Sequence, residues 1–128
     1  MISRPPTVAL TGARSSARKV SELGTLLERQ GLGVKTAFVD WTDPGTTEGH
    51  DPRRELAQGL RSADVLYLLA AAGRVSVEMS LLAGIAHGLG KPIYISEPTE
   101  DEAIDALAAG IVSPSKLCPA ALGLEPHR

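Results

Sequence analysis

The chain has 128 residues and a formal net charge of −2 at pH 7, a size that fits one domain with a single core. The balanced charge argues against a nucleic acid or an anionic membrane as the main partner. A single cysteine, Cys118, excludes an internal disulfide and a multi-cysteine metal site. No apolar run resembles a signal peptide or a membrane span, so we expect a soluble, cytoplasmic protein.

The first element predicted is a short apolar strand over residues 7–12, which ends in a polar loop. A helix follows, because Val20, Leu23 and Leu27 recur at helical spacing before Gly31. The loop between them holds a permissive glycine, an arginine and hydroxyl groups, which together favour a phosphate or sugar-hydroxyl site. The alternative is that Ser15 or Ser16 only caps the helix. The loop that carries this signal runs from Gly12 to Ser16.

A second strand is predicted over residues 33–39, followed by a long polar loop that reaches Pro52. Loops of this length in a compact domain are often functional. Asp40 and Trp41 could therefore wall a ligand pocket. The sequence Asp43-Pro44-Gly45 is also ordinary turn chemistry, which leaves a purely structural loop as the alternative.

A third helix–strand unit places a carboxylate at the expected ligand edge. A helix begins at Asp51 or Pro52, and the buried strand Val65–Leu69 follows it. Ser76 then caps a helix of small residues that stops at Gly90, with Glu78 in its first turn. Glu78 could react with a ligand beyond the strand ends, or it could simply balance the helix dipole. Asp64 precedes its strand, at the opposite edge, and is assigned a structural role.

The remaining elements are shorter. Pro92 opens the apolar strand P-I-Y-I-S, and Thr99 is expected to cap a helix whose first turn is acidic. Ile104, Leu107 and Ala108 form the buried face of that helix before Gly110 stops it. Residues 111–112 can make a last strand, and residues 115–128 are expected to form an irregular tail of the single domain 1–128.

Strands that alternate with helices at this spacing predict an α/β fold with right-handed crossovers. We expect a flavodoxin-like three-layer α/β/α sandwich with a mainly parallel five-stranded sheet in the order 2-1-3-4-5. This order would bring the loop after the first strand next to the helix that begins at Ser76.

The chain resembles the nucleoside 2-deoxyribosyltransferase-like superfamily, which includes nucleoside deoxyribosyltransferases and nucleotide N-glycosidases. The resemblance covers about residues 7–114. It rests on V-A-L-T-G-A-R-S-S, on S-A-D-V-L-Y-L-L and on I-S-E-P followed by I-V-S-P. Its most specific part is A-G-I-A-H-G-L-G-K-P-I-Y, which is similar to the family pattern E-x-G-x-A-x-x-x-G-K-P.

The resemblance implies displacement at the anomeric carbon of a nucleoside or nucleotide. A Glu at the start of the helix after the third strand attacks or stabilises that carbon, which here implies Glu78 as the catalytic residue. In the loop after the first strand, Gly12, Ala13, Arg14 and Ser15 would hold the sugar or its 5′-phosphate. Ser76 and Gly73 would face the same ligand, and Glu55 is the candidate for a second, sugar-holding acid. The resemblance also implies no metal, no cofactor and a homodimer or higher homo-oligomer.

One departure from the family pattern supports a second function. The family Glu aligns with position 82, where this chain has Leu, and Glu78 lies one turn earlier. The alternative to a glycosidase or transferase is therefore a non-catalytic protein that binds a nucleotide or ribosyl ligand.

Overall fold

A computed structural model describes residues 4–36 and 52–124, with the backbone alone described for residue 14 and for residues 52–56. The chain forms one five-stranded sheet in which every neighbouring pair of strands is parallel. The strand order is β2-β1-β3-β4-β5, which confirms the predicted order. The strands are β1 (Thr7–Gly12), β2 (Gly33–Thr36), β3 (Val65–Leu69), β4 (Ile93–Ile95) and β5 (Gly110–Ile111).

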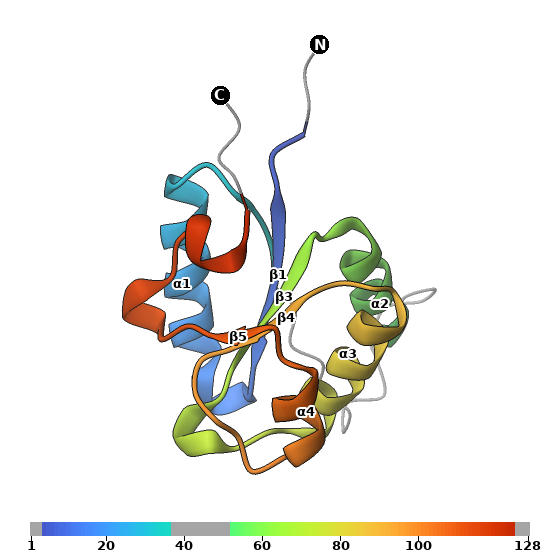
Figure 1. The fold of residues 1–128 in the computed structure, drawn as a ribbon. Helices are drawn as coiled ribbons and strands as arrows, with labels where there is room; N and C mark the ends of the chain where they lie inside the picture. The colour runs from blue at the N-terminus through green and yellow to red at the C-terminus, as the bar shows by residue number, and fades with distance from the viewer. Residues whose placement is uncertain (1–3, 37–51, 125–128) are drawn as a thin grey trace.

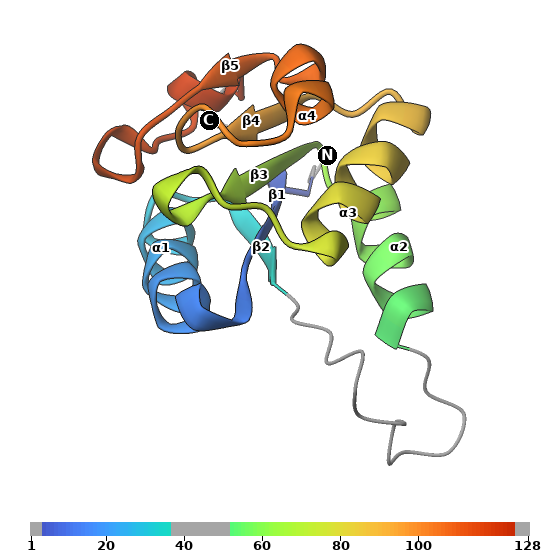
Figure 2. The same ribbon diagram turned by 90° about the horizontal axis from the view of Figure 1, so that it is seen from below.

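Helices cover both faces of the sheet and make the predicted three-layer α/β/α sandwich (Figure 1). One face carries α1 and two C-terminal 3-10 turns, and the other carries α2, α3 and α4 (Figures 1 and 2). The α-helices are α1 (Ala17–Arg29), α2 (Pro52–Ser62), α3 (Val77–Gly88) and α4 (Glu102–Leu107). The two turns are Pro114–Lys116 and Ala120–Leu122.

The sheet separates two hydrophobic clusters, because alternate residues of a strand point to opposite faces. In β3 all five residues are buried, as expected for a central parallel strand. Leu66 and Leu68 pack with Met79 and Leu82 of α3, whereas Tyr67 and its neighbours pack on the α1 side. The Tyr67 hydroxyl donates a hydrogen bond to the Val112 carbonyl oxygen at 2.7 Å, so the buried phenol is satisfied.

The amino end of the sheet is fastened by Asp64, as the sequence predicted. Its Oδ2 accepts a hydrogen bond from the Thr7 backbone N–H at 2.7 Å, and its own N–H donates to the Thr7 carbonyl at 2.8 Å. Arg4 lies 3.7 Å from the other carboxylate oxygen. These contacts join the start of β1 to the start of β3 and give Asp64 a structural role.

The acidic helix α4 is capped by a different residue from the one predicted. We expected Thr99, but the N-cap is Asp101, whose Oδ1 accepts hydrogen bonds from the N–H groups of Ala103 and Ile104 at 2.9 and 3.2 Å. Thr99 lies too far ahead of the first helical turn to reach those donors. Its hydroxyl instead donates to Asp105 Oδ1 at 2.6 Å.

The C-terminal part also differs in detail from the prediction. The last strand begins at Gly110, one residue earlier than predicted, because Gly110 pairs with Tyr94 in the sheet. The two residues are closely packed: a Cβ at Gly110 would come within 3.3 Å of the Tyr94 ring. The segment expected to be irregular contains the two 3-10 turns. It buries Leu117 and Leu122 in the core on the α1 side.

Candidate functional site

The carboxyl edge of the sheet brings two predicted site segments together. Gly12, the last residue of β1, lies opposite Leu69, the last residue of β3. The candidate loop after β1 and the loop that leads to α3 therefore start from adjacent positions. In open parallel sheets, ligands bind at this carboxyl edge, where the connections after two neighbouring strands lead to helices on opposite faces of the sheet.

The β1 loop is a tight turn that closes on the start of α1. The Ser16 N–H donates to the Ala13 carbonyl at 2.8 Å, and Arg14–Ser16 form a 3-10 turn. Ser16 is the N-cap of α1, although its side chain makes no capping hydrogen bond. The Ser15 side chain is exposed and has no hydrogen bond to any described residue. Ser15 can therefore donate to or accept from a ligand.

The glycine at position 12 is required by packing. A Cβ there would lie 3.0 Å from the Leu69 carbonyl oxygen and 3.2 Å from Val20 Cγ2. The close approach of strand end and helix fixes where the β1 loop begins. Gly12 therefore has a packing role that positions the β1 loop.

The β3–α3 loop has a special backbone conformation. Ala72 has φ 55° and ψ 34°, and Gly73 has φ 72°. A left-handed alanine is unfavourable, and such residues persist where surrounding contacts determine them. Here the Gly73 carbonyl accepts a hydrogen bond from the Glu100 N–H at 2.8 Å, and a Cβ at Gly73 would lie 3.1 Å from the Pro98 carbonyl oxygen. Gly73 thus has a packing role at the site edge.

The start of α3 is built as the sequence predicted. The Ser76 hydroxyl accepts a hydrogen bond from the Met79 N–H at 3.2 Å, and the Met79 sulfur accepts one from the Ser76 N–H at 3.4 Å. These contacts satisfy backbone donors that a helix start leaves open. The Ser76 hydroxyl hydrogen remains available to a ligand.

Glu78 occupies the first turn of α3 and is half-buried. No hydrogen bond or ion pair links its carboxylate to the described part of the chain. The free N–H groups of a helix start favour a negative charge at this position. The arrangement can present an anionic oxygen nucleophile to an electron-poor carbon.

Leu82, which the resemblance aligns with the family Glu, lies in the core. It is 2% exposed and packs with Met79 and with the sheet residues Leu68 and Ile95. A carboxylate could not replace Leu82 without burying its charge among apolar groups. Glu78, one turn nearer the helix start, is half-buried and keeps contact with solvent.

The β4–α4 loop supports this helix start, a role that the sequence did not indicate. The Ser96 hydroxyl is buried and binds both the N–H and the carbonyl of Ala70, at 2.8 and 3.2 Å. Glu100 Oε1 accepts a hydrogen bond from the Val75 N–H at 3.2 Å. The Ser80 hydroxyl donates to Asp101 Oδ2 at 3.3 Å. The only signal in the sequence was a Ser directly after the strand.

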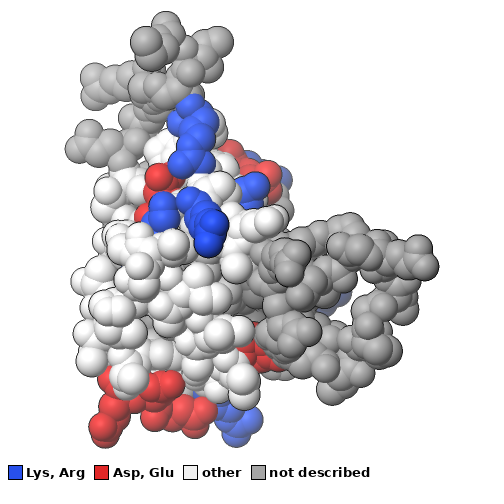
Figure 3. Space-filling view, turned by 90° about the vertical axis from the view of Figure 1, so that its right-hand side faces the viewer, with Lys and Arg blue, Asp and Glu red and all other residues white. Residues whose placement is uncertain are grey.

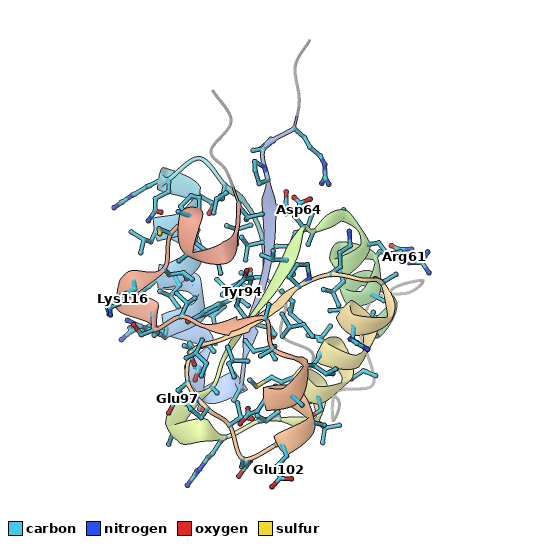
Figure 4. All side chains as sticks on the ribbon, in the orientation of Figure 1. Arg61, Asp64, Tyr94, Glu97, Glu102 and Lys116 are labelled. Carbon is cyan, nitrogen blue, oxygen red and sulfur yellow. The ribbon has the colours of Figure 1, made fainter. Side chains whose placement is uncertain are left out.

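Acidic side chains gather at this edge. Glu97 and Glu102 lie at the end of the molecule where β4 and the other strands finish, and Asp64 lies at the opposite end (Figure 4). Within the described ranges, no group of three or more His, Cys, Asp or Glu residues has the arrangement of a metal site. Asp101 and Asp105 are engaged in capping and turn contacts, so these carboxylates serve the loop.

The structure does not describe the side chains of the other predicted site residues. Asp40 and Trp41 lie outside the described residues. Glu55 lies in the first turns of α2, where only the backbone is described. The helix α2 packs beside α3 on the same face of the sheet (Figure 2).

No protein-family model matches the sequence, and no curated protein sequence matches it either. A search of solved structures finds a 2-deoxyribosyltransferase from Bacillus psychrosaccharolyticus with a TM-score of 0.67. The alignment covers 95% of this chain and 99% of that one, at 14% sequence identity. The chain has a deoxyribosyltransferase-like fold. The similarity extends over the whole of that enzyme, and the resemblance seen in the sequence is confirmed at the level of the fold.

The two loops described above follow the carboxyl ends of adjacent parallel strands, the edge at which open parallel sheets bind ligands. At 14% identity the likeness is one of backbone fold. In the described part of the chain no helix is long and apolar enough to cross a membrane.

Proposed function

We propose that this protein cleaves or transfers the N-glycosidic bond of a nucleoside or nucleotide. The observation that carries the proposal is Glu78, which has no hydrogen-bond or ion-pair partner among the described residues and lies in the first turn of α3, the helix that follows the loop after β3. The fold shared with a 2-deoxyribosyltransferase supports the same chemistry.

In the proposed reaction the Glu78 carboxylate forms a bond to the anomeric carbon as the bond from that carbon to the base nitrogen breaks. The electron pair of the broken bond leaves with the base, which takes a proton from solvent or from a side chain. Water then releases the sugar, or a second base accepts it. The β1 loop, with the exposed Ser15 and the backbone of residues 12–14, would hold the sugar or its 5′-phosphate.

A second function is favoured by Leu82. If activity requires a carboxylate at that position, the buried leucine leaves a protein that binds a nucleotide or ribosyl ligand without turning it over. Glu78 would then only balance the helix dipole, a contribution of roughly 0.3–1 kcal/mol.

The two functions are separated by a panel of ribonucleosides, deoxyribonucleosides and their 5′-monophosphates, each incubated with and without a second free base. Chromatography measures the released base, and isothermal titration calorimetry measures binding to the same compounds. We expect release or exchange of base with at least one class. Binding without any release would favour the non-catalytic function, and neither binding nor release would contradict both.

The proposed cellular setting is the cytoplasm, where the thiol of Cys118 would stay reduced. We also propose, as the resemblance implies, that the protein acts as a homodimer or higher homo-oligomer. It needs no cofactor in the proposed reaction.

A further inference from the structure

Glu100, in the loop between β4 and α4, hydrogen-bonds at two places to the segment that leads into α3. Its N–H donates to the Gly73 carbonyl at 2.8 Å, and its Oε1 accepts a hydrogen bond from the Val75 N–H at 3.2 Å. Within residues 4–36 and 52–124, no other element hydrogen-bonds to residues 71–75. Glu100 therefore supplies the hydrogen bonds that tie this segment to the rest of the described fold.

The segment depends on such contacts, because local preference does not favour its backbone conformation. Ala72 has φ 55° and Gly73 has φ 72°. A left-handed alanine is unfavourable in an isolated loop and persists where surrounding contacts determine it. The packing is close, since a Cβ at Gly73 would lie 3.1 Å from the Pro98 carbonyl oxygen and 3.7 Å from Thr99 Cα. The β4–α4 loop therefore lies directly against the segment.

The segment ends at the helix turn that carries Glu78. Val75 directly precedes the N-cap Ser76, and Glu78 directly precedes Met79, the first buried residue of α3. The N–H groups of a first helical turn have no partner within the helix, so the cap and the chain before it determine where this turn lies. The hydrogen bond from Val75 to Glu100 fixes the chain at that point.

Asp101, the residue after Glu100, holds the next turn of the same helix. Its Oδ2 accepts a hydrogen bond from the Ser80 hydroxyl at 3.3 Å, while its Oδ1 caps α4. Two adjacent residues of one loop thus bind the chain on either side of Glu78, at Val75 and at Ser80. These contacts fix the start of α3 relative to the β4–α4 loop.

We propose that Glu100 is a positioning residue for Glu78. Through Val75 it holds the first turn of α3 where the Glu78 carboxylate can attack the anomeric carbon, and this role of Glu78 rests on the proposed function. A displacement of about 1 Å is enough to slow such a step strongly. The partner of Glu100 is a neutral N–H, so the contact requires an acceptor oxygen, which an amide side chain also supplies.

Acidic side chains gather at this end of the molecule, as Figures 3 and 4 show. Replacing Glu100 by a neutral residue therefore also lowers the local negative charge, and two variants separate that effect from the hydrogen bond. Glu100→Gln removes the charge and keeps the acceptor oxygen. Glu97→Ala removes a charge from the same loop, and Glu97 has no hydrogen bond or ion pair to the described residues.

Steady-state rates of base release test the positioning role. We expect Glu100→Ala to lower kcat about tenfold and to change KM by less than about twofold, because only the placement of the nucleophile is lost. Glu100→Gln and Glu97→Ala should stay within about twofold of the wild type. In a Glu78→Gln background, Glu100→Ala should cause no further loss, because Glu100 acts through Glu78.

Three kinetic results would overturn the inference. They are an unchanged kcat for Glu100→Ala, a Glu100→Gln protein as slow as Glu100→Ala, and a further tenfold loss when Glu100→Ala is added to Glu78→Gln. The last result would mean that Glu100 acts independently of the Glu78 carboxylate.

Amide hydrogen exchange, followed by NMR without substrate, tests the contact apart from catalysis. Glu100→Ala should speed exchange at Val75 at least about fivefold, whereas Glu100→Gln and Glu97→Ala should not, and exchange in β3 should stay the same in all three. Equal exchange at Val75 in Glu100→Ala and the wild type would overturn the inference whatever the activity. A wild type that releases no base but shows the exchange difference would overturn the proposed function and the catalytic role of Glu100, and would leave its hold on the start of α3 confirmed.

Discussion

Gly12 and Leu69 end adjacent parallel strands, and a Cβ at Gly12 would lie 3.0 Å from the Leu69 carbonyl oxygen. This one contact fixes the distance between the β1 loop and the β3–α3 loop, the two segments that supply the candidate site. We expect Gly12→Ala to force the strand ends apart and to lower the free energy of unfolding by about 1–3 kcal/mol.

Urea denaturation measures that change. The control is Gly59→Ala in α2, where a Cβ would make only an ordinary contact, 3.8 Å from Lys35 Cδ. Because alanine is the better helix former, this variant should be more stable by about 0.5–1 kcal/mol. A Gly12→Ala protein as stable as the wild type would show that the strand ends are not constrained as described.

The Ser96 hydroxyl holds the base of the β3–α3 loop through both backbone groups of Ala70. Ser96→Ala leaves a buried N–H without its acceptor, which should cost about 1–3 kcal/mol of unfolding free energy. Ser113→Ala removes only an exposed contact to Ser115 and should change stability by less than about 0.5 kcal/mol. Equal stabilities of the two variants in urea would argue against a structural role for Ser96.

Burial of Tyr67 predicts how stability changes at alkaline pH. Burial raises the pKa of the Tyr67 phenol well above its ordinary value of 10.0. The unfolded chain therefore loses this proton at lower pH than the folded chain, so the stabilisation is complete below pH 10 and falls as the pH rises beyond it. Unfolding free energies measured across this range should fall less steeply for Tyr67→Phe than for the wild type.

Below pH 10, the free energy of unfolding of the Tyr67→Phe variant measures the contribution of the hydrogen bond from the Tyr67 hydroxyl to Val112. Its loss should cost about 0.5–1.5 kcal/mol. All other side chains are the same in the two proteins, so the difference between the two profiles isolates Tyr67. Parallel profiles would mean that the phenol ionises as readily in the folded protein as in the unfolded one.

Asp64 is an acidic residue with a structural role, and its substitution should affect stability and not activity. Asp64→Ala removes the acceptor of the Thr7 N–H at the amino edge, away from the candidate site. We expect it to lower the unfolding free energy by about 1–2 kcal/mol, with little added by the exposed pair to Arg4. The base-release rate of the folded protein should not change, and a large loss of activity without unfolding would contradict the placement of the site.

The sequence predicted most of the strands and the start of α3 because those features depend on local patterns, and the strand order is the one that a small α/β chain favours. Buried runs such as Val65–Leu69, the cap Ser76 and the stop at Gly90 are each encoded within a few residues. Gly90 has φ 73°, as a helix-terminating glycine requires.

Features that depend on contacts between distant segments were not predictable. The cap of α4 is Asp101, whereas the Thr99 hydroxyl donates a hydrogen bond to Asp105. The sequence alone does not distinguish Asp101 from Thr99 as the cap. Leu117 and Leu122 lie in turns too short to show a period. At the candidate site, the left-handed Ala72 lies beside Gly73, whose backbone contacts Pro98 and Glu100, and only the folded chain brings these segments together.

The most direct test of the proposed catalytic role compares initial rates of base release by the wild type, Glu78→Gln and Glu102→Gln on the best substrate of the panel. Glu102 also lies in the first turn of a helix at this edge, so its substitution removes a comparable charge without removing the proposed nucleophile. We predict a loss of roughly 100-fold or more for Glu78→Gln and a change of less than about threefold for Glu102→Gln. Equal rates for Glu78→Gln and the wild type would show that the Glu78 carboxylate takes no part in the reaction.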